Sequence, residues 1–183
     1  MPYLETGLRC LIGLVFVVSA AGKLIRRASL REFVASVAAM RLLRPGHVPG
    51  AAAVVVAGEV AVCVLMALPG PMPQAGFALA GALLVAFSVA ILMAVRRQVT
   101  AACRCFGTST VPLGRRHIAR NACLAVASGL GCVAVASPEA ATDVNALILA
   151  AFAGVVAGTL VVFLDELSEL FGPGRFPQTR HPG

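Results

Sequence analysis

The segment GAAAVVVAGEVAVCVLMAL, residues 50–68, is apolar from end to end except for one carboxylate, Glu59. A helix rises about 1.5 Å per residue, so about 20 apolar residues are needed to cross the roughly 30 Å of hydrocarbon in a bilayer. Lipid supplies no hydrogen-bond partners, so the backbone of such a segment must satisfy its own polar groups as a helix. The segment therefore predicts a membrane-spanning helix with one ionisable group near its middle.

Four further segments have a similar length and character, namely residues 7–24, 74–95, 118–136 and 144–164. In the whole chain of 183 residues, 59% are hydrophobic and only 13% are charged, whereas about a quarter of the residues of a soluble domain are charged. We therefore predict an all-α integral membrane protein, a bundle of about five transmembrane helices with the lipid bilayer as its solvent. Residues 1–170 are expected to form a single domain, and the Pro- and Gly-rich tail, 171–183, is expected to be disordered.

The connection between the first two spans carries a helical pattern of its own. Its apolar residues recur at helical spacing, and these are Leu30, Phe33, Val34, Val37 and Leu42. Ser29 and Glu32 have the S-x-x-E spacing of a capping box, which closes free N–H groups at the start of a helix. We expect a short amphipathic helix in the membrane interface, capped by Ser29 and ended by Pro45 and Gly46.

Basic residues gather around two of the four connections. Six surround the first connection and six surround the third, twelve of the 15 in the chain: Lys23, Arg26, Arg27, Arg31, Arg41, Arg44, Arg96, Arg97, Arg104, Arg115, Arg116 and Arg120. By the positive-inside rule these two connections are cytoplasmic, which puts the N-terminus outside and the C-terminus in the cytoplasm. The net charge of +7 therefore indicates orientation in a cell membrane, and no nucleic-acid partner is expected.

Cys103 and Cys105 stand one residue apart in the longest polar interruption of the chain, whereas the other four cysteines lie in apolar runs. Two thiols at this spacing can close a strained disulfide, which is reduced more readily than a structural one. Arg104 lies between them, and a cationic setting favours the reactive thiolate. The pattern indicates thiol–disulfide exchange. Two free cysteines in a basic loop, or a metal held with His117 and Cys123, stay open as alternatives, although the spacing matches no common zinc pattern.

The two thiols are expected to differ in exposure. Phe106 should bury itself toward the bilayer and draw Cys105 with it, which leaves Cys103 accessible. We therefore predict that Cys103 attacks and that Cys105 resolves. No bound metal ion or cofactor is predicted.

Polar residues at two other places in the chain are candidates for the site. An intramembrane carboxylate such as Glu59 is costly and is a functional candidate by default, with Lys23 or Arg120 as its cationic partner. A purely structural ion pair is the alternative. His117 and Asn121 are four residues apart and share a helix face at the start of the fourth span. Either a redox role or hydrogen bonding at the helix end would explain them.

Gly154 and Gly158 form a G-x-x-x-G pattern in the fifth span. Small residues at this spacing let a second helix approach closely. We expect that second helix to belong to the same bundle and not to another copy of the chain.

Parts of the sequence resemble a known family. Cys103-Arg-Cys105-Phe-Gly, a short loop and His117-Ile-Ala-Arg-Asn opening an apolar helix are similar to the MauE family of methylamine utilisation membrane proteins and to the broader DoxX-like redox-associated group. The run Ser19-Ala-Ala-Gly-Lys23 in the first span and a glutamate in the second span also fit this family. The resemblance covers about residues 7–124.

The resemblance implies a multi-spanning helical protein in the redox maturation of exported proteins. For MauE this means maturation of the methylamine dehydrogenase β-subunit beside a thioredoxin-like partner. The candidate catalytic residues are then Cys103, Cys105, His117 and Glu59, and whether the chain is itself a thiol–disulfide oxidoreductase stays open. The alternatives are a non-catalytic scaffold for a thioredoxin-like partner, or a membrane protein that binds a metal or a quinone. Maturation takes place outside the cytoplasm, whereas the charge rule puts the cysteine pair on the cytoplasmic face.

Overall fold

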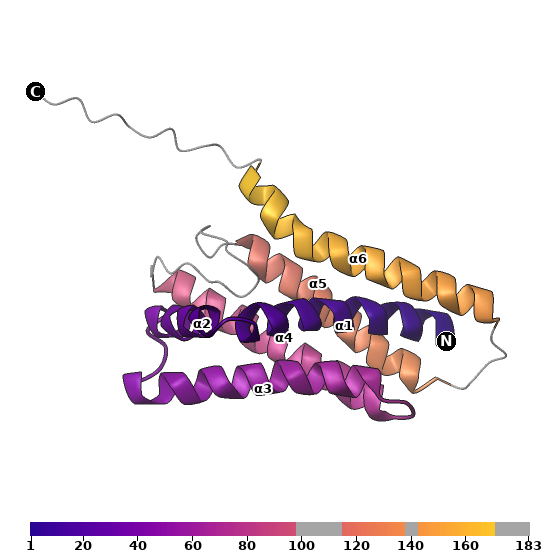
Figure 1. Cartoon of the computed structure of the whole chain (residues 1–183), viewed down its shortest axis with the longest axis horizontal. Helices are drawn as coiled ribbons and strands as arrows, with labels where there is room; N and C mark the ends of the chain where they lie inside the picture. The colour runs from indigo at the N-terminus through magenta and orange to yellow at the C-terminus, as the bar shows by residue number, and fades with distance from the viewer. Residues whose placement is uncertain (98–114, 138–142, 171–183) are drawn as a thin grey trace, which may run out of the picture.

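The structure, a computed structural model, describes residues 1–97, 115–137 and 143–170. Its elements are α1 (Pro2–Leu24), α2 (Arg27–Ala39), the 3-10 helix η1 (Pro45–His47), α3 (Val48–Ala67), α4 (Met72–Arg96), α5 (Arg115–Val135) and α6 (Val144–Leu170) (Figure 1). The residues described contain no strand, so the all-α prediction is confirmed. The tail expected at 171–183 lies outside them.

Within the described residues, the five helices α1, α3, α4, α5 and α6 are each long and apolar enough to cross a membrane. Each overlaps one of the predicted segments, although α1 begins earlier than expected, at Pro2, and α6 continues to Leu170. Five spans place the start of α1 and the end of α6 at opposite ends of the bundle (Figure 1). The sequence prediction of a multi-pass membrane protein is therefore confirmed.

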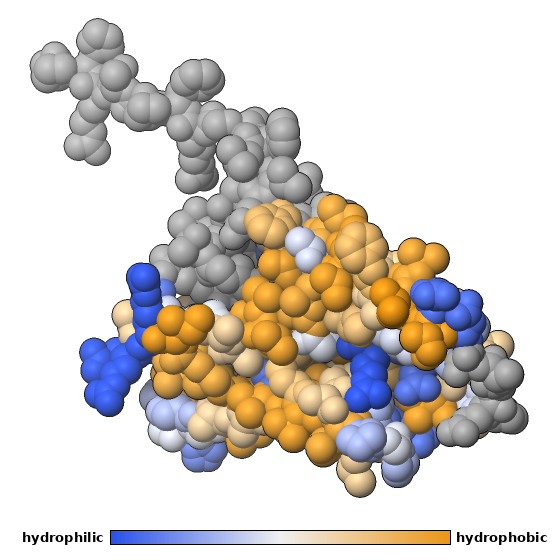
Figure 2. Space-filling view, turned by 45° about the vertical axis from the view of Figure 1, so that its right-hand side comes forward, coloured by the Kyte–Doolittle hydropathy of each residue, from blue (hydrophilic) through white to orange (hydrophobic). Residues whose placement is uncertain are grey.

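Helix α1 lies at the centre of the bundle. It packs against α6 on one side and against α3 and α5 on the other, while α4 packs against both α3 and α5 (Figure 1). The core where these helices meet contains large buried apolar side chains, among them Ile12, Val62, Phe77, Leu84 and Leu124. The outer surface in Figure 2 is also largely apolar, as contact with lipid requires.

One face of α3 is buried, although the helix is apolar on every side. Its buried residues recur every three or four positions: Val48, Ala52, Val56, Glu59, Val62 and Met66. Val54 and Val64, on other faces, are exposed. Hydrophobicity alone cannot select between faces that are equally apolar. The carboxylate of Glu59 selects the buried face, because a charged group is costly in lipid and is almost always turned toward the interior of a bundle.

The short amphipathic helix expected between the first two spans is α2, and its apolar face lies against the first half of α3. Phe33 is buried beside Ala52 and Val56 of α3, and Leu30, Val34 and Val37 pack around them. The opposite face of α2 carries exposed arginines and Glu32. This amphipathic helix therefore covers the beginning of α3.

The capping box predicted at Ser29 and Glu32 is wrong. Helix α2 begins at Arg27, its N-cap residue is Arg26, and no side chain caps it. Only Ile25 and Arg26 separate α1 from α2, and Arg26 is extended, with φ −128° and ψ 133°. The chain turns within that one residue, and the carbonyl of Arg26 already accepts the N–H of Leu30 at 3.3 Å. Ser29 therefore lies inside the first helical turn.

Arg9 of α1 closes the C-terminal end of α3. Its Nε donates to the carbonyl of Met66, and its Nη2 donates to the carbonyl of Leu68 at 2.8 Å. The last carbonyls of a helix have no partner within the helix, and α3 ends in an extended Leu68 without the glycine that commonly caps a helix. A side chain from the neighbouring helix supplies the missing hydrogen bonds.

The two glycines of α6 let it approach α1 closely. A Cβ atom at Gly154 would overlap the carbonyl oxygen of Gly7, and one at Gly158 would lie 3.2 Å from the carbonyl oxygen of Leu11. At the start of α6, the N–H of Asp143 donates to the hydroxyl of Tyr3 at 2.9 Å. The expectation that the G-x-x-x-G pattern packs within the bundle is thus confirmed.

Replacing Gly154 by Ala is expected to destabilise the protein by about 1–3 kcal/mol, because the added methyl group forces α6 away from α1. Gly129 is the matched control, since it is also helical but has nothing within 4 Å of an added Cβ. Gly129→Ala should be neutral or stabilising by up to about 1 kcal/mol, because alanine is the better helix former. Unfolding in detergent measures both variants. Equal effects of the two substitutions would contradict the close α1–α6 contact.

Candidate functional site

Glu59 and Lys23 form a buried ion pair between α3 and α1. The Nζ of Lys23 donates to Oε1 of Glu59 at 2.7 Å and to Oε2 at 2.9 Å. Lys23 is 2% exposed and Glu59 is 1% exposed. Of the two cations that the sequence offers as partners for Glu59, the structure pairs it with Lys23.

Ser19 completes the hydrogen bonding of this pair. It lies one turn before Lys23 in α1, and its hydroxyl donates to Oε1 of Glu59 at 2.8 Å while it accepts from Nζ of Lys23 at 2.7 Å. Nζ also lies 5.0 Å from the centre of the Phe33 ring, within the range of a cation–π contact. The cluster of Ser19, Lys23, Phe33 and Glu59 therefore joins α1, α2 and α3 at one point.

The chemistry of this cluster is that of a neutral, internally satisfied unit. Both carboxylate oxygens accept hydrogen bonds, and the ammonium group has oxygen partners and an aromatic face. Buried charges of opposite sign are tolerated when they are close together and fully hydrogen bonded. In this arrangement the cluster fixes the relative positions of three helices. No group of three or more His, Cys, Asp or Glu side chains that could hold a metal occurs among the residues described.

His117 lies in the first turn of α5, with Asn121 one turn later on the same face. His117 is half-buried, while Asn121 is only 4% exposed. The guanidinium of Arg120 donates to Oδ1 of Asn121 at 3.5 Å. In the described part of the chain α5 packs on α4 and α1 and not extensively on α3. His117 and Glu59 therefore stand on helices that share no substantial interface.

Cys103 and Cys105 lie between residues 98 and 114, outside the described residues. The helices on either side of this segment, α4 and α5, end and begin at the same end of the bundle as α2 and the start of α3, at the left of Figure 1. A hydrogen bond ties this end together, because the guanidinium of Arg97 donates to the carbonyl of Arg41 at 3.2 Å. The first connection and the end of α4 thus meet at one end of the bundle.

The four cysteines in the described helices form no disulfide with one another. Cys10, Cys63 and Cys132 are half-buried, and Cys123 is exposed on α5. Cys63 and Cys132 pack against the central core, and Sγ of Cys132 lies 3.7 Å from the carbonyl oxygen of Gln74. Cys63 and Cys132 thus serve as packing groups, as is usual for buried cysteines.

The contacts of three residues are not predicted from the sequence: Ser19, Arg9 and Phe33. Ser19 has a detectable signal, because it lies four residues before Lys23 and so shares its helix face. Arg9 has one too, since a charge inside an apolar span is rarely without a partner. The contact of Phe33 with Lys23 has no such signal, because it depends on how α2 folds back over α1.

The fold and the cluster define the class of the protein: a multi-spanning α-helical membrane protein whose first two spans are joined by a buried ion pair. A family model described as "Methylamine utilisation protein MauE" matches residues 1–134, and the chain belongs to this family. The match includes the Lys23–Glu59 pair, the Cys103–Cys105 segment and the first four spans, and it ends before α6. No curated protein and no solved structure matches the chain.

Proposed function

We propose that this MauE-family protein is a membrane component of thiol–disulfide exchange that serves the maturation of an exported protein. The observation that carries the proposal is the pair Cys103 and Cys105, which falls inside the region matched by the family model. Methylamine dehydrogenase is the substrate that the family description favours, and a thioredoxin-like protein is the partner whose chemistry fits two closely spaced thiols.

The proposed exchange conserves both electrons and protons. The thiolate of Cys103 attacks a disulfide of the partner, and a mixed disulfide forms as one partner thiolate leaves. Cys105 then attacks Cys103 in this mixed disulfide, which releases the second partner thiol and closes the bond between Cys103 and Cys105. The partner gains two electrons and the pair loses two. The reverse sequence oxidises a reduced partner.

Basic residues at the end of the bundle where α4 ends support the proposal, because the segment with the two cysteines follows α4 in the sequence. Arg41, Arg44 and Arg97 are exposed, and Arg97, which directly follows α4, donates to the carbonyl of Arg41 at this end of the bundle. Positive charge nearby lowers the free energy of a thiolate. The same charges favour a cytoplasmic position for this end and an external N-terminus. Reporter domains fused after Leu68 and at the C-terminus test this orientation, since the first should be external and the second cytoplasmic.

Replacing Cys103 and Cys105 together by Ser is expected to abolish maturation of the partner protein, because no thiol remains to exchange. The measurement is the yield of mature partner in cells that carry each variant. Cys123→Ser, which removes an exposed cysteine from α5, is the control and should leave the yield unchanged. Full maturation with the double variant would favour a non-catalytic scaffold that docks the thioredoxin-like partner. Zinc or copper bound stoichiometrically by the wild type, and lost in the double variant, would favour a metal site.

A further inference from the structure

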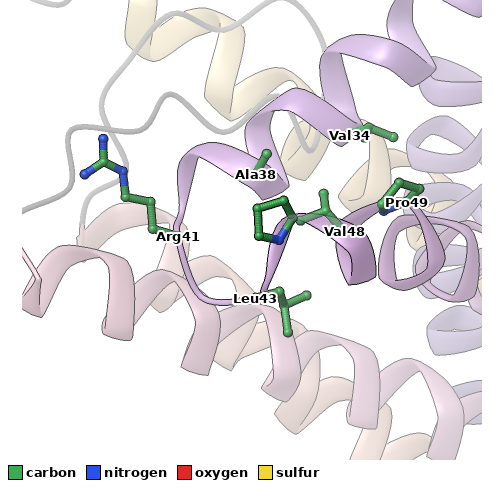
Figure 3. A pocket seen from close by; sticks show the side chains of 7 residues that line it. Val34, Ala38, Arg41, Leu43, Val48 and Pro49 are labelled. Carbon is green, nitrogen blue, oxygen red and sulfur yellow. The ribbon is translucent and has the colours of Figure 1, made fainter.

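An apolar groove of about 430 Å³ lies between α2, the start of α3 and the turn that joins them. Its walls include Val34 and Ala38 of α2, Leu43 of the turn, and Val48 and Pro49 of α3 (Figure 3). This groove shares no lining residue with the Lys23–Glu59 cluster. The position of the groove in the fold and the basic residues around it indicate which kind of molecule it can bind.

The groove lies at the start of a segment that is long and apolar enough to cross a membrane. Val48 and Pro49 stand at the beginning of a membrane-spanning segment, Pro45–Ala67, and α2 is the amphipathic helix beside it. Amphipathic helices of this kind lie at the boundary between headgroups and acyl chains. The apolar walls therefore face the region of the bilayer where acyl chains begin.

Arg41 forms the polar rim of the groove. In Figure 3 its guanidinium extends away from the apolar side chains and toward the outside of the molecule. The backbone of Arg41 is in the left-handed conformation, with φ 52°, which is unfavourable for a residue other than glycine. The hydrogen bond from Arg97 to its carbonyl helps to hold it there. The fold thus holds the backbone of a cationic residue at the edge of an apolar surface.

The charge around the groove is strongly positive. The segment from the end of α1 to the start of η1 exposes one acidic side chain, Glu32. It exposes five basic ones: Arg26, Arg27, Arg31, Arg41 and Arg44. Anionic headgroups are attracted to such clusters by about 1 kcal/mol per basic residue. An amphiphile with an acyl chain and a negative headgroup matches both the apolar walls and the charged rim.

We propose that this groove is a binding site for an anionic phospholipid of the surrounding bilayer. An acyl chain packs between α2 and the start of α3, and the phosphate of the headgroup pairs with the guanidinium of Arg41. The proposal does not depend on the cysteine pair or on its redox chemistry.

The test is native mass spectrometry of the delipidated full chain with equal amounts of dioleoylphosphatidylglycerol and dioleoylphosphatidylcholine. The wild type is expected to retain phosphatidylglycerol in preference to phosphatidylcholine. Arg41→Gln should weaken phosphatidylglycerol binding about fivefold and phosphatidylcholine binding less, because the choline group offsets the charge of the phosphate in the second lipid. Arg31→Gln is the matched control. It removes the same charge from a residue of α2 that does not line the groove.

A second pair of variants tests the apolar walls. Ala38→Trp fills the groove and should weaken binding of both lipids, whereas Ala35→Trp adds the same bulk to an exposed residue of α2 outside it. If Ala38→Trp does not fold, Arg41→Gln decides alone. Equal retention of the two lipids by the wild type, or equal losses with Arg41→Gln and Arg31→Gln, would overturn the proposal. So would complete displacement of the lipid by soluble glycerol 3-phosphate, which would show that the site binds a free phosphate.

Discussion

Glu59→Leu is expected to lower the free energy of unfolding by about 3–5 kcal/mol, because the substitution leaves the ammonium group of Lys23 buried without its carboxylate. Lys23 is 2% exposed and has Glu59 as its ion-pair partner, so water cannot replace the lost charge unless the helices separate. Lys23→Met should cost a similar amount, since it strands the carboxylate of Glu59 in the same way. Unfolding of the purified chain in detergent measures both effects.

The double variant, Lys23→Met with Glu59→Leu, distinguishes a buried pair from two independent residues. Apolar side chains of similar volume commonly replace a buried ion pair with little loss, so the double variant should recover most of the stability lost by either single variant. Arg31→Met removes an exposed charge from α2 and should change the stability by no more than about 0.5 kcal/mol. Losses that simply add in the double variant would contradict the coupling between Lys23 and Glu59.

The same double variant separates structure from function. If the cluster only holds α1, α2 and α3 together, a folded double variant should support partner maturation at the wild-type level. If the charges also take part in the exchange, the double variant should fold and yet lose maturation. Measuring stability and maturation on the same preparations gives a direct answer.

Cys105→Ser is expected to accumulate a mixed disulfide between Cys103 and the redox partner, because the thiol that would resolve this intermediate is missing. Cys103→Ser should accumulate none, since Cys103 is predicted to be the attacking thiol. The expectation rests on the sequence next to each cysteine: Phe106 follows Cys105 directly, whereas Ala102 precedes Cys103. Non-reducing gels of cells quenched with acid and then alkylated show the adduct, and mass spectrometry identifies the partner.

The control for trapping is Cys105→Ser combined with Cys103→Ser, which should lose the adduct completely. Cys105→Ser combined with Cys123→Ser should keep it, because Cys123 is an exposed residue of α5 and not a member of the proposed exchanging pair. Equal trapping by the two single variants would contradict the assignment of roles. A failure of both to trap an oxidised partner would count against thiol–disulfide exchange itself.

The sequence predicts the helices of this protein better than their mutual contacts. Long apolar segments are decisive for spanning helices because lipid leaves the backbone no alternative, and all five segments form helices. The capping box at Ser29 and Glu32 is wrong because local spacing does not reveal that Arg26 alone turns the chain. The choice of Lys23 over Arg120 as partner of Glu59 likewise depends on which helices are neighbours.

In the candidate site, too, the sequence indicates single residues better than the contacts between helices. Glu59 is detectable because one carboxylate in an apolar segment is conspicuous, and Ser19 is detectable by its helical spacing from Lys23. Arg9 bonds to Met66 and Leu68 at the end of α3, which follow it in the sequence by 57 and 59 residues. No periodicity in the sequence encodes such a pairing, because it depends on where one helix ends beside another.

During synthesis α1 leaves the ribosome before α3, and each carries one half of the Lys23–Glu59 pair. An acidic or basic residue near the centre of a helix opposes its transfer from the insertion channel into lipid by about 2.5–3.5 kcal/mol. Once α1 is present, Glu59 meets Lys23 and Ser19 in place of hydrocarbon, and most of this opposition disappears. We expect α1 to remain beside the channel until α3 arrives, so that the two helices enter the bilayer together and the bundle begins to assemble while its last helices are still being translated.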